Sequence, residues 1–428
     1  MKNFEVPSGY RSPLIVAIKQ KRKLDDKLKK DFTPTELDFG KVKIYLARHF
    51  GFCYGVENAI DIAYRTIEEN KGKRIFLLSE MIHNPQVNND LTSKGVQFLQ
   101  DTLGKELIPL SELTKEDIVI IPAFGTTLEL EEKLRAKGIA IESYDTTCPF
   151  VEKVWNRSEK LGVDQHTIIV HGKFNHEETR ATFSRSAKNA HVLILKDIEE
   201  AKFLAQVING EKSSEEFHAF FKGRYTENFN PAVDLEKIGV VNQTTMLATE
   251  TQEIADFLRQ TMIAKYGEST IKNHIADTRD TLCYATNDNQ TANLELLQIP
   301  ADFAIVVGGH NSSNTTHLVE ILETKFPTYF IETAQELISD TSIQSFDIHQ
   351  KKLVEFNNYI PSSNGSLSVI VTSGASCPDA IVDNVIQRLI SFVNPTVTTT
   401  YTAICTVNGC ASSPSKDAVI TVINQTPP

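Results

Sequence analysis

The sequence lacks any apolar run long enough to span a membrane. Near the N-terminus, the run PLIVAI is far shorter than a bilayer-spanning helix requires. The basic run KQKRKLDDKLKK follows it, which reverses the order of a secretory signal peptide, and the N-terminus is too poor in serine for a typical transit peptide. We therefore expect a cytoplasmic protein that has no membrane partner.

The sequence is also poor in cysteine and in positive charge. Its six cysteines are irregularly spaced in a chain of 428 residues and form no CxxC pair, so a disulfide framework is not expected. Reduced thiols, metal ligation or redox chemistry fit this pattern better. Lysine and arginine number 44 against 55 acidic residues, and the net charge of −11 argues against a general nucleic-acid-binding protein.

Short β-branched runs alternate with amphipathic stretches from Lys41 onward. The runs TIIVHG, DFAIVVGG and LSVIVT are typical of strands, whereas VENAIDIAYRTIEE and DAIVDNVIQRLISF are typical of helices. Continuous apolar strands that alternate with helices indicate sheets covered on both faces. The pattern therefore predicts an α/β fold with mainly parallel sheets.

The length allows two to four domains, and the pattern suggests where they divide. We predict α/β lobes at residues 41–148, 149–282 and 283–393, after an N-terminal extension of residues 1–40. The segment NGEKSSEEFHAFFKGRYTENFNPAVDLE has no clear period and is interpreted as an insertion or a lid-like segment. The tail, residues 394–428, is rich in Thr, Ser and Val, with short alternating strands around an NG turn. It is unrelated in style to the α/β body, and we assign it no catalytic role.

Three cysteines, Cys53, Cys148 and Cys283, each precede a stretch that is predicted to begin a helix. A helix N-terminus favours negative charge and therefore suits a thiolate ligand. Three such positions suggest three lobes that converge on one metal centre, and an odd number of thiolates can leave one metal position open. Spacing alone does not separate iron–sulfur from zinc, and a buried cysteine is often only a small apolar residue. The remaining cysteines are interpreted as non-ligands: Cys377, Cys405 and Cys410.

Polar loops follow several of the predicted strands. HGKFNHEET brings His176 together with Glu177 and Glu178, which suits anion binding and proton transfer. NQTT, GGHNSSNTTH and SGASCPD offer hydroxyl and amide groups at helix N-termini, where phosphate oxygens bind, and IHNPQV adds His83. Each loop alone is equally consistent with an ordinary helix cap. Together they predict a phosphate pocket and a carboxylate proton source, and hence reductive chemistry on a small phosphorylated substrate.

These motifs, in this order, resemble those of the LytB/IspH family of 4-hydroxy-3-methylbut-2-enyl diphosphate reductases. The matching segments span residues 41–393 and include GFCYGVENAI, EMIHNPQVNNDL, PAFGTT, DTTCPFVEKVW, HGKFNHEET, NQTTMLATET, TLCYATNDNQ, VVGGHNSSNTTHL and VTSGASCPD. The resemblance is strongest to the longer plant and cyanobacterial type of this family.

The resemblance implies a trefoil of three α/β lobes around a 4Fe–4S cluster. Cys53, Cys148 and Cys283 match the cluster cysteines of the family, and the fourth iron would be open to the substrate. The implied reaction is the reductive dehydroxylation of an allylic diphosphate alcohol to isopentenyl and dimethylallyl diphosphate, the last step of the non-mevalonate (methylerythritol phosphate) pathway. A ferredoxin- or flavodoxin-type protein would supply the electrons.

The resemblance also implies roles for individual side chains. Glu178 would supply a proton, and Thr244 would hold the substrate hydroxyl group or a water molecule. Histidine, serine and asparagine side chains would bind the diphosphate, namely His83, His176, Ser312, Ser313, Asn314 and Ser376.

Two positions depart from the family pattern. Phe124 stands in PAFG where shorter bacterial members carry a histidine, so one diphosphate contact is missing or comes from elsewhere. His171 is a candidate replacement, and a structural role for it is equally consistent. Cys377 stands where the family usually has a small or hydroxyl residue. A cluster-dependent dehydratase and a non-catalytic iron–sulfur or zinc protein remain as alternative functions.

Overall fold

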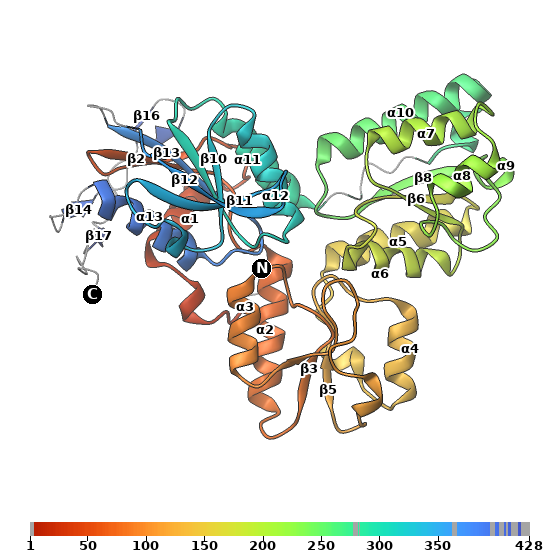
Figure 1. Ribbon diagram of the computed structural model, residues 1–428, viewed down its shortest axis with the longest axis horizontal. Coiled ribbons are helices and arrows are strands. Elements are labelled where there is room, and N and C mark those ends of the chain that lie inside the picture. Colours follow the sequence, from red (N-terminus) through yellow and green to blue (C-terminus); the bar gives the residue numbers. More distant parts are fainter. Residues whose placement is uncertain are drawn as a thin grey trace. The chain divides into compact units, whose positions relative to one another are not determined.

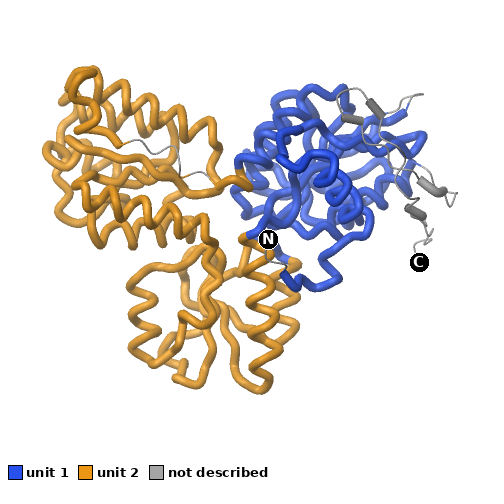
Figure 2. The backbone as a smooth tube through the Cα atoms, turned by 180° about the vertical axis from the view of Figure 1, so that it is seen from behind, with its two compact units in different colours: residues 1–54, 83–85, 287–428 blue, residues 55–82, 86–286 orange. Residues whose placement is uncertain are grey.

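The computed structural model describes residues 4–276, 281, 283–361 and 366–393, and beyond these only four short strands. The chain divides into two compact units, which Figure 2 distinguishes by colour. Unit 1 comprises residues 1–54, 83–85 and 287–428, and unit 2 comprises residues 55–82 and 86–286.

Unit 1 contains a five-stranded sheet (Figure 1). Its strands are β1 (Thr35–Asp38), β2 (Val42–Leu46), β9 (Phe303–Val307), β10 (Thr328–Ile331) and β13 (Leu367–Ser373). Their order in the sheet is β1-β2-β13-β9-β10. All neighbouring pairs are parallel except β1 and β2, which pair antiparallel at one edge.

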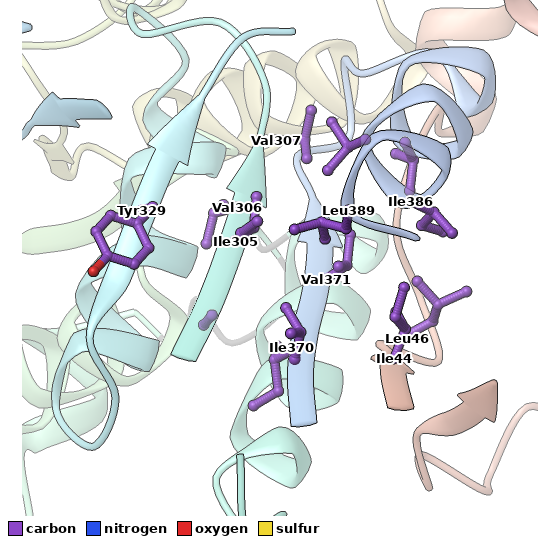
Figure 3. Close-up of a cluster of buried hydrophobic side chains, with 14 of the residues drawn as sticks. Ile44, Leu46, Ile305, Val306, Val307, Tyr329, Ile370, Val371, Ile386 and Leu389 are labelled. Atoms are coloured by element: carbon purple, nitrogen blue, oxygen red, sulfur yellow. The ribbon is translucent and has the colours of Figure 1, made fainter. Parts of the chain in front are cut away.

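Helices cover this sheet and bury its strands. The helices are α1 (Pro13–Asp25), α11 (Tyr284–Leu296), α12 (Ser313–Glu323) and α13 (Asp379–Val393), with short 3-10 helices η1 (Ser8–Tyr10) and η5 (Ala334–Glu336). α12 packs on β9 and β10, α13 packs on β2 and β13, and α1 packs on α13. Figure 3 shows the resulting core, in which Ile305, Val371 and Leu389 are fully buried. A separate hairpin, β11 (Ser342–Asp347) and β12 (Lys352–Asn357), follows β10.

The N-terminal residues are part of unit 1. Ser12 caps α1 by accepting a hydrogen bond from the backbone N–H of Ile15, and Ile15 and Ile18 are buried. Lys19 forms an ion pair with Asp379 of α13, with 2.7 Å between nitrogen and oxygen. The predicted N-terminal extension, residues 1–40, thus packs on the α/β part of unit 1. The sequence did not show this packing, because two buried isoleucines are too few to reveal a helical period.

The predicted boundary of the first lobe also differs from the observed pairing. β2 lies at the start of that predicted lobe, yet it pairs with β13, in the register Ile44 with Val369. Such pairing between strands far apart in the chain leaves no local signal in the sequence. The three-lobe division and its arrangement around a centre stay predictions.

Unit 2 contains two three-stranded parallel sheets. The first has the order β4-β3-β5, with β3 (Ile75–Leu77), β4 (Gln97–Phe98) and β5 (Ile118–Ile120). Helices α2 (Tyr54–Glu69) and α3 (Pro85–Ser93) lie on one side and α4 (Leu128–Ala136) on the other (Figure 1). Short 3-10 helices η2 (Leu110–Glu112) and η3 (Ile141–Tyr144) complete this part.

The second sheet of unit 2 has the order β7-β6-β8, with β6 (Thr167–His171), β7 (Val192–Leu195) and β8 (Ile238–Asn242). α5 (Pro149–Val163) and α6 (Glu177–Ala187) cover one face, and α7 (Ile198–Ile208) and α10 (Ala248–Tyr266) cover the other. All three strands are fully buried, which explains their uninterrupted apolar sequences.

The segment interpreted as a lid, residues 209–236, is packed onto the second sheet's core. It contains α8 (Ser214–Phe220) and α9 (Pro231–Asp234). Outside this segment, the 3-10 helix η4 (Ile271–Asn273) follows α10. Phe217, Phe221 and Phe229 are buried in one cluster with residues of α7 and α10. A segment anchored by three buried aromatic rings is not a lid that opens freely.

The α/β class with mainly parallel sheets is thus confirmed. No helix among the described residues combines the length and apolarity that a membrane-spanning segment needs. In the tail, β14 (Thr399–Tyr401) pairs with β17 (Ala418–Ile420), and β15 (Thr406–Val407) pairs with β16 (Cys410–Ala411). The predicted NG turn and Cys405 lie outside the described residues.

The core of unit 1 gives a first prediction. Leu389→Ala in α13 removes a fully buried side chain and should lower the free energy of opening unit 1 by about 2–5 kcal/mol. Leu353→Ala on β12, where the leucine is 46% exposed, should change it by less than about 0.5 kcal/mol. Native-state hydrogen exchange of the β13 amides would measure both effects. Equal effects from the two variants would contradict this description of the core.

Candidate active site

The predicted site residues are distributed over both units. Glu178, Thr244, Cys148, Cys283 and His176 belong to unit 2. The others belong to unit 1, namely Cys53, His83, Ser312, Ser313, Asn314 and Ser376.

In unit 1, two polar loops meet at the carboxyl ends of β9 and β13. The strands are parallel neighbours whose last residues, Val307 and Ser373, are in register, so the loops that follow them emerge side by side. The Oδ1 atom of Asn314 accepts a hydrogen bond from the backbone N–H of Ala375 at 2.9 Å, which joins the two loops. Ser312 caps α12 by accepting a hydrogen bond from the backbone N–H of Thr315.

The loop that carries His83 joins the same edge of unit 1. The hydroxyl group of Ser376 donates a hydrogen bond to the carbonyl oxygen of His83 at 3.1 Å. A Cβ atom on Gly309 would lie 2.6 Å from that oxygen, so only glycine allows this close approach. The structure therefore brings together all the diphosphate-binding residues predicted in unit 1: His83, Ser312, Ser313, Asn314 and Ser376.

This edge of unit 1 offers hydrogen-bond donors to an anion. The Nδ2 atom of Asn314 is buried and has no hydrogen-bond partner among the described residues. It stands in the first turn of α12, where backbone N–H groups and the helix dipole favour negative charge. An unused buried donor is costly unless a ligand or water accepts from it. The arrangement therefore suits a phosphate group.

Cys53 lies on a turn that α1 and α13 hold in place. Its backbone N–H donates to the carbonyl oxygen of Ala375 at 3.1 Å, which ties it to the polar loops. Gly51 has φ of +75°, and a Cβ atom there would lie 2.5 Å from Oδ1 of Asp379 and 2.9 Å from Nζ of Lys19. The Lys19–Asp379 ion pair thus packs directly against Gly51, in the turn before Cys53. Sequence reasoning missed this ion pair, because its residues are far apart in the chain.

In unit 2, Glu178 and Thr244 are in direct contact. Glu178 stands in the first turn of α6, after β6, and Thr244 follows β8, the parallel neighbour of β6. The Thr244 backbone N–H donates to Oε1 of Glu178 at 2.5 Å, and its hydroxyl group donates to Oε2 at 2.9 Å. Glu178 is only 1% exposed, so both carboxylate oxygens are fixed in a buried position. The structure brings the two predicted catalytic residues together.

His176 precedes Glu178 and caps α6. Its Nδ1 atom accepts a hydrogen bond from the Glu178 backbone N–H at 3.1 Å. In the neutral imidazole this assigns the proton to Nε2, which then is a donor. The ring of Phe124 packs edge-on against His176, with 5.4 Å between the centroids. At this position the resemblance implies a histidine in shorter members of the family. Phe124 instead places an apolar ring beside His176, and this ring offers no side-chain hydrogen bond.

His171 does not replace the missing histidine. It is fully buried, its Nδ1 atom lies 2.8 Å from the hydroxyl oxygen of Thr251, and its Nε2 atom lies 3.1 Å from the carbonyl oxygen of Lys196. Both ring nitrogens are thus engaged within unit 2. Of the two roles that the sequence left open, the structural role holds.

Gln243 is a residue of this site that the sequence reasoning did not single out. Its Oε1 atom accepts hydrogen bonds from the Lys173 backbone N–H and from the hydroxyl group of Thr179, at 3.1 and 3.0 Å. Its Nε2 atom donates to the hydroxyl oxygen of Thr245. Gln243 thereby joins the loop before α6 to the loop after β8, which holds Glu178 and Thr244 together. Its only signal in the sequence was its place in the NQTT segment, a polar loop after a predicted strand.

The cysteines of unit 2 lie at helix starts, as predicted. Cys148 is the N-cap residue of α5, and a Cβ atom on Gly55 would collide with its sulfur atom, so only glycine at this position lets the thiol lie against the start of α2. Burial raises the pKa of the Cys283 thiol, and the backbone N–H groups of Thr286 and Ala285 oppose this effect. N–H groups directed at sulfur suit a thiolate ligand.

Cys377 has a different environment from these cysteines. It is fully buried in unit 1, and burial raises the pKa of its thiol strongly, which favours the neutral form over a thiolate. Its sulfur atom lies 3.6 Å from the carbonyl oxygen of Pro378. This environment supports the interpretation that Cys377 is not a ligand. Among the residues that the structure describes, no three or more His, Cys, Asp or Glu side chains form a ready metal site.

Comparison with known proteins identifies the family. The sequence profile described as LytB protein matches residues 44–390, most of the chain. The chain belongs to the LytB family.

Curated members of the LytB family cover the same region. A 4-hydroxy-3-methylbut-2-enyl diphosphate reductase from Synechococcus sp. (strain WH7803) is 41% identical over 83% of this chain and 86% of its own length. The reductase of the same name from Microcystis aeruginosa is also 41% identical, over 83% and 86%. The predicted likeness to cyanobacterial members is consistent with these relatives.

A solved structure supports the fold. The E-1-hydroxy-2-methyl-but-2-enyl-4-diphosphate reductase from Plasmodium falciparum gives a TM-score of 0.58 at 23% identity, over 82% of this chain and 88% of that chain. The LytB match begins within β2 and ends within α13. Helix α1, β1 and the tail therefore lie outside the matched region.

The turn before Cys53 gives a second prediction. Gly51→Ala should speed hydrogen exchange of the Cys53 amide by at least about tenfold, because the new Cβ atom would displace Asp379 and Lys19. Gly40→Ala is the matched control: Gly40 has nearly the same φ, +78°, but open space around its Cβ position. If Gly40→Ala accelerated exchange of that amide equally, general backbone strain rather than crowding would be responsible.

Proposed function

We propose that this chain catalyses the reductive dehydroxylation of (E)-4-hydroxy-3-methylbut-2-enyl diphosphate to isopentenyl and dimethylallyl diphosphate. It would thus perform the last step of the non-mevalonate pathway. The contact between Glu178 and Thr244 carries the proposal, because it places a buried acid and a hydroxyl donor together in a member of the LytB family. The relatives named as reductases of this substrate support it.

The diphosphate group is bound by the polar edge of unit 1. The unused Nδ2 donor of Asn314, the N-terminus of α12 and the hydroxyl groups nearby suit phosphate oxygens. Ser312, Ser313 and Ser376 supply those hydroxyl groups, and His83 lies beside them. His176 is proposed to add its Nε2 donor. These groups bind and orient the substrate without taking part in bond breaking.

Glu178 acts as the general acid. Hydroxide is a poor leaving group, and a proton delivered to the departing oxygen lets it leave as water. The Thr244 hydroxyl group lies 2.9 Å from Oε2 of Glu178, so it is close enough to orient the substrate hydroxyl or a water beside the acid. The buried position of Glu178 excludes bulk water from this transfer.

We further propose that Cys53, Cys148 and Cys283 ligate a 4Fe–4S cluster that leaves one iron open. The donor set fits this group, because these thiols lie at helix starts, backbone N–H groups face Cys283, and Gly55 lets the Cys148 sulfur lie against the start of α2. When bound, the cluster would pass two electrons to the substrate and act as a Lewis acid toward its hydroxyl oxygen. A ferredoxin- or flavodoxin-type protein as electron donor and a cytoplasmic location stay predictions.

Anaerobic purification with metal analysis tests this function. We expect a brown protein that contains iron and acid-labile sulfide in equal amounts and that consumes the allylic diphosphate only while a reductant is supplied. A colourless zinc protein would contradict the cluster proposal. Turnover that continues without reductant would instead identify a dehydratase.

The general acid gives a third prediction. Glu178→Gln should lower kcat by at least about 100-fold, because an amide cannot donate the acidic proton. Iron content, and the affinity for the diphosphate substrate measured by calorimetry, should change little. Glu177→Gln is the matched control: Glu177 is the adjacent buried carboxylate but accepts a hydrogen bond from the Ser79 hydroxyl. Near wild-type turnover in Glu178→Gln would show that another group is the acid.

A further inference from the structure

The end of α1 and the turn after it form an exposed surface that is both basic and apolar. We call residues 23–30 the 23–30 tip. Leu24 and Leu28 are 72% and 76% exposed, and Leu28 has the highest exposed fraction among the exposed large apolar side chains of the described residues. Exposed lysines surround them, and in the described part of the chain these lysines form no ion pair: Lys23, Lys27 and Lys30.

Buried contacts hold the 23–30 tip in a defined conformation. Arg22, which is buried, donates hydrogen bonds to the carbonyl oxygens of Asp31 and Thr33, at 3.3 and 2.8 Å. The backbone N–H of Asp31 in turn donates to Oδ2 of Asp26 at 2.9 Å. The chain is therefore fastened on both sides of Leu28. The lysines and leucines project from a fixed turn rather than from a free terminus.

The 23–30 tip borders the loop that leads to Cys53. Asp26 lies 3.8 Å from the guanidinium group of Arg48, which belongs to that loop. Burial raises the pKa of Asp288 in α11, and the positive charges of Lys29 and Arg48 oppose this effect, so the tip is within electrostatic reach of α11 as well. A molecule that docks on the tip would lie against the part of unit 1 that carries Cys53.

Two simpler explanations account less well for this surface. A solvated helix end explains lysines but not two leucines that are more than two-thirds exposed. A membrane-surface helix needs an apolar face along its length, whereas Ile15 and Ile18 of α1 are buried inside unit 1. Basic groups around a small apolar centre fit an acidic protein partner. The charge is complementary to such a partner although the whole chain carries a net charge of −11.

We propose that the 23–30 tip is the docking surface for a small acidic protein that carries one electron. This inference rests on the proposed function, which requires an external reductant. Two reduced carriers would be oxidised for each turnover, and their two electrons, with two protons, would release the substrate hydroxyl group as water. The lysines would steer the carrier by its carboxylates, and the leucines would pack against it in a small, short-lived interface.

The experiment compares two reductants with the intact, cluster-loaded protein. Reduced ferredoxin of strongly negative net charge serves as the protein carrier, and dithionite serves as the chemical reductant. The variant Lys23→Glu/Lys27→Glu/Lys30→Glu should raise the KM for ferredoxin by about tenfold or more and abolish its dependence on salt. The dithionite-driven rate and the iron content should stay unchanged. Leu24→Ser/Leu28→Ser should also raise the KM, without a change in salt dependence.

A matched control separates docking from overall charge. Lys41→Glu/Lys351→Glu/Lys352→Glu makes the same change in charge at three other exposed lysines of unit 1 and should leave the KM for ferredoxin unchanged. An equal rise in KM for this control, or none for the 23–30 variants, would overturn the proposal. So would binding of the wild type to anionic phospholipid vesicles together with an unaltered KM in the variants. Absence of dithionite-driven turnover in the wild type would instead refute the proposed function, and the docking proposal with it.

Discussion

Parallel pairing of neighbouring strands determines where the polar side chains of the candidate site come together in this protein. In unit 1 the last residues of β9 and β13, Val307 and Ser373, are in register, and in unit 2 His171 of β6 is in register with Asn242 of β8. Parallel strands end at the same edge of a sheet, so their following loops meet there. Each unit uses this edge differently: unit 1 gathers hydrogen-bond donors suited to an anion, and unit 2 gathers a carboxylate with a threonine that binds both its oxygens.

Much of the fold could be predicted because the central strands of both units are buried. Segments such as β9 and β6 are continuous apolar runs, and this pattern is specific to covered sheets. Helix α1 could not be recognised, because Ile15 and Ile18 are its only buried apolar residues and two positions are too few to show a helical period. Strand β1, with the sequence TELD, is a short antiparallel edge strand without an apolar run. The pairing of β2 with β13 depends on tertiary contacts that no local pattern records.

The residues of the candidate site fall into the same two groups: those that a local sequence motif indicates, and those whose role depends on contacts between distant segments. Glu178, Thr244 and His83 could be proposed as site residues because each lies in a short motif to which the resemblance to the LytB/IspH family gives an expected role. Gln243 and the Lys19–Asp379 pair were missed, because their importance comes from contacts with segments far away in the chain. Motifs therefore predict the groups that are proposed to react, whereas the groups that hold them in position became visible only in the folded chain.

The two kinds of anion site that we propose in unit 1 differ in a way that follows from the cost of burial. The proposed diphosphate site uses neutral donors such as Asn314 and backbone N–H groups, because a buried lysine would lose more hydration than a buried amide does. The 23–30 tip uses lysines, because these remain hydrated at the surface and act on an approaching partner before contact. At physiological ionic strength, screening limits such forces to about 8 Å, so local charge rather than the net charge of −11 governs each encounter. Under these two proposals, an acidic chain would bind an anionic substrate through buried neutral donors and an acidic partner protein through exposed lysines, at separate places.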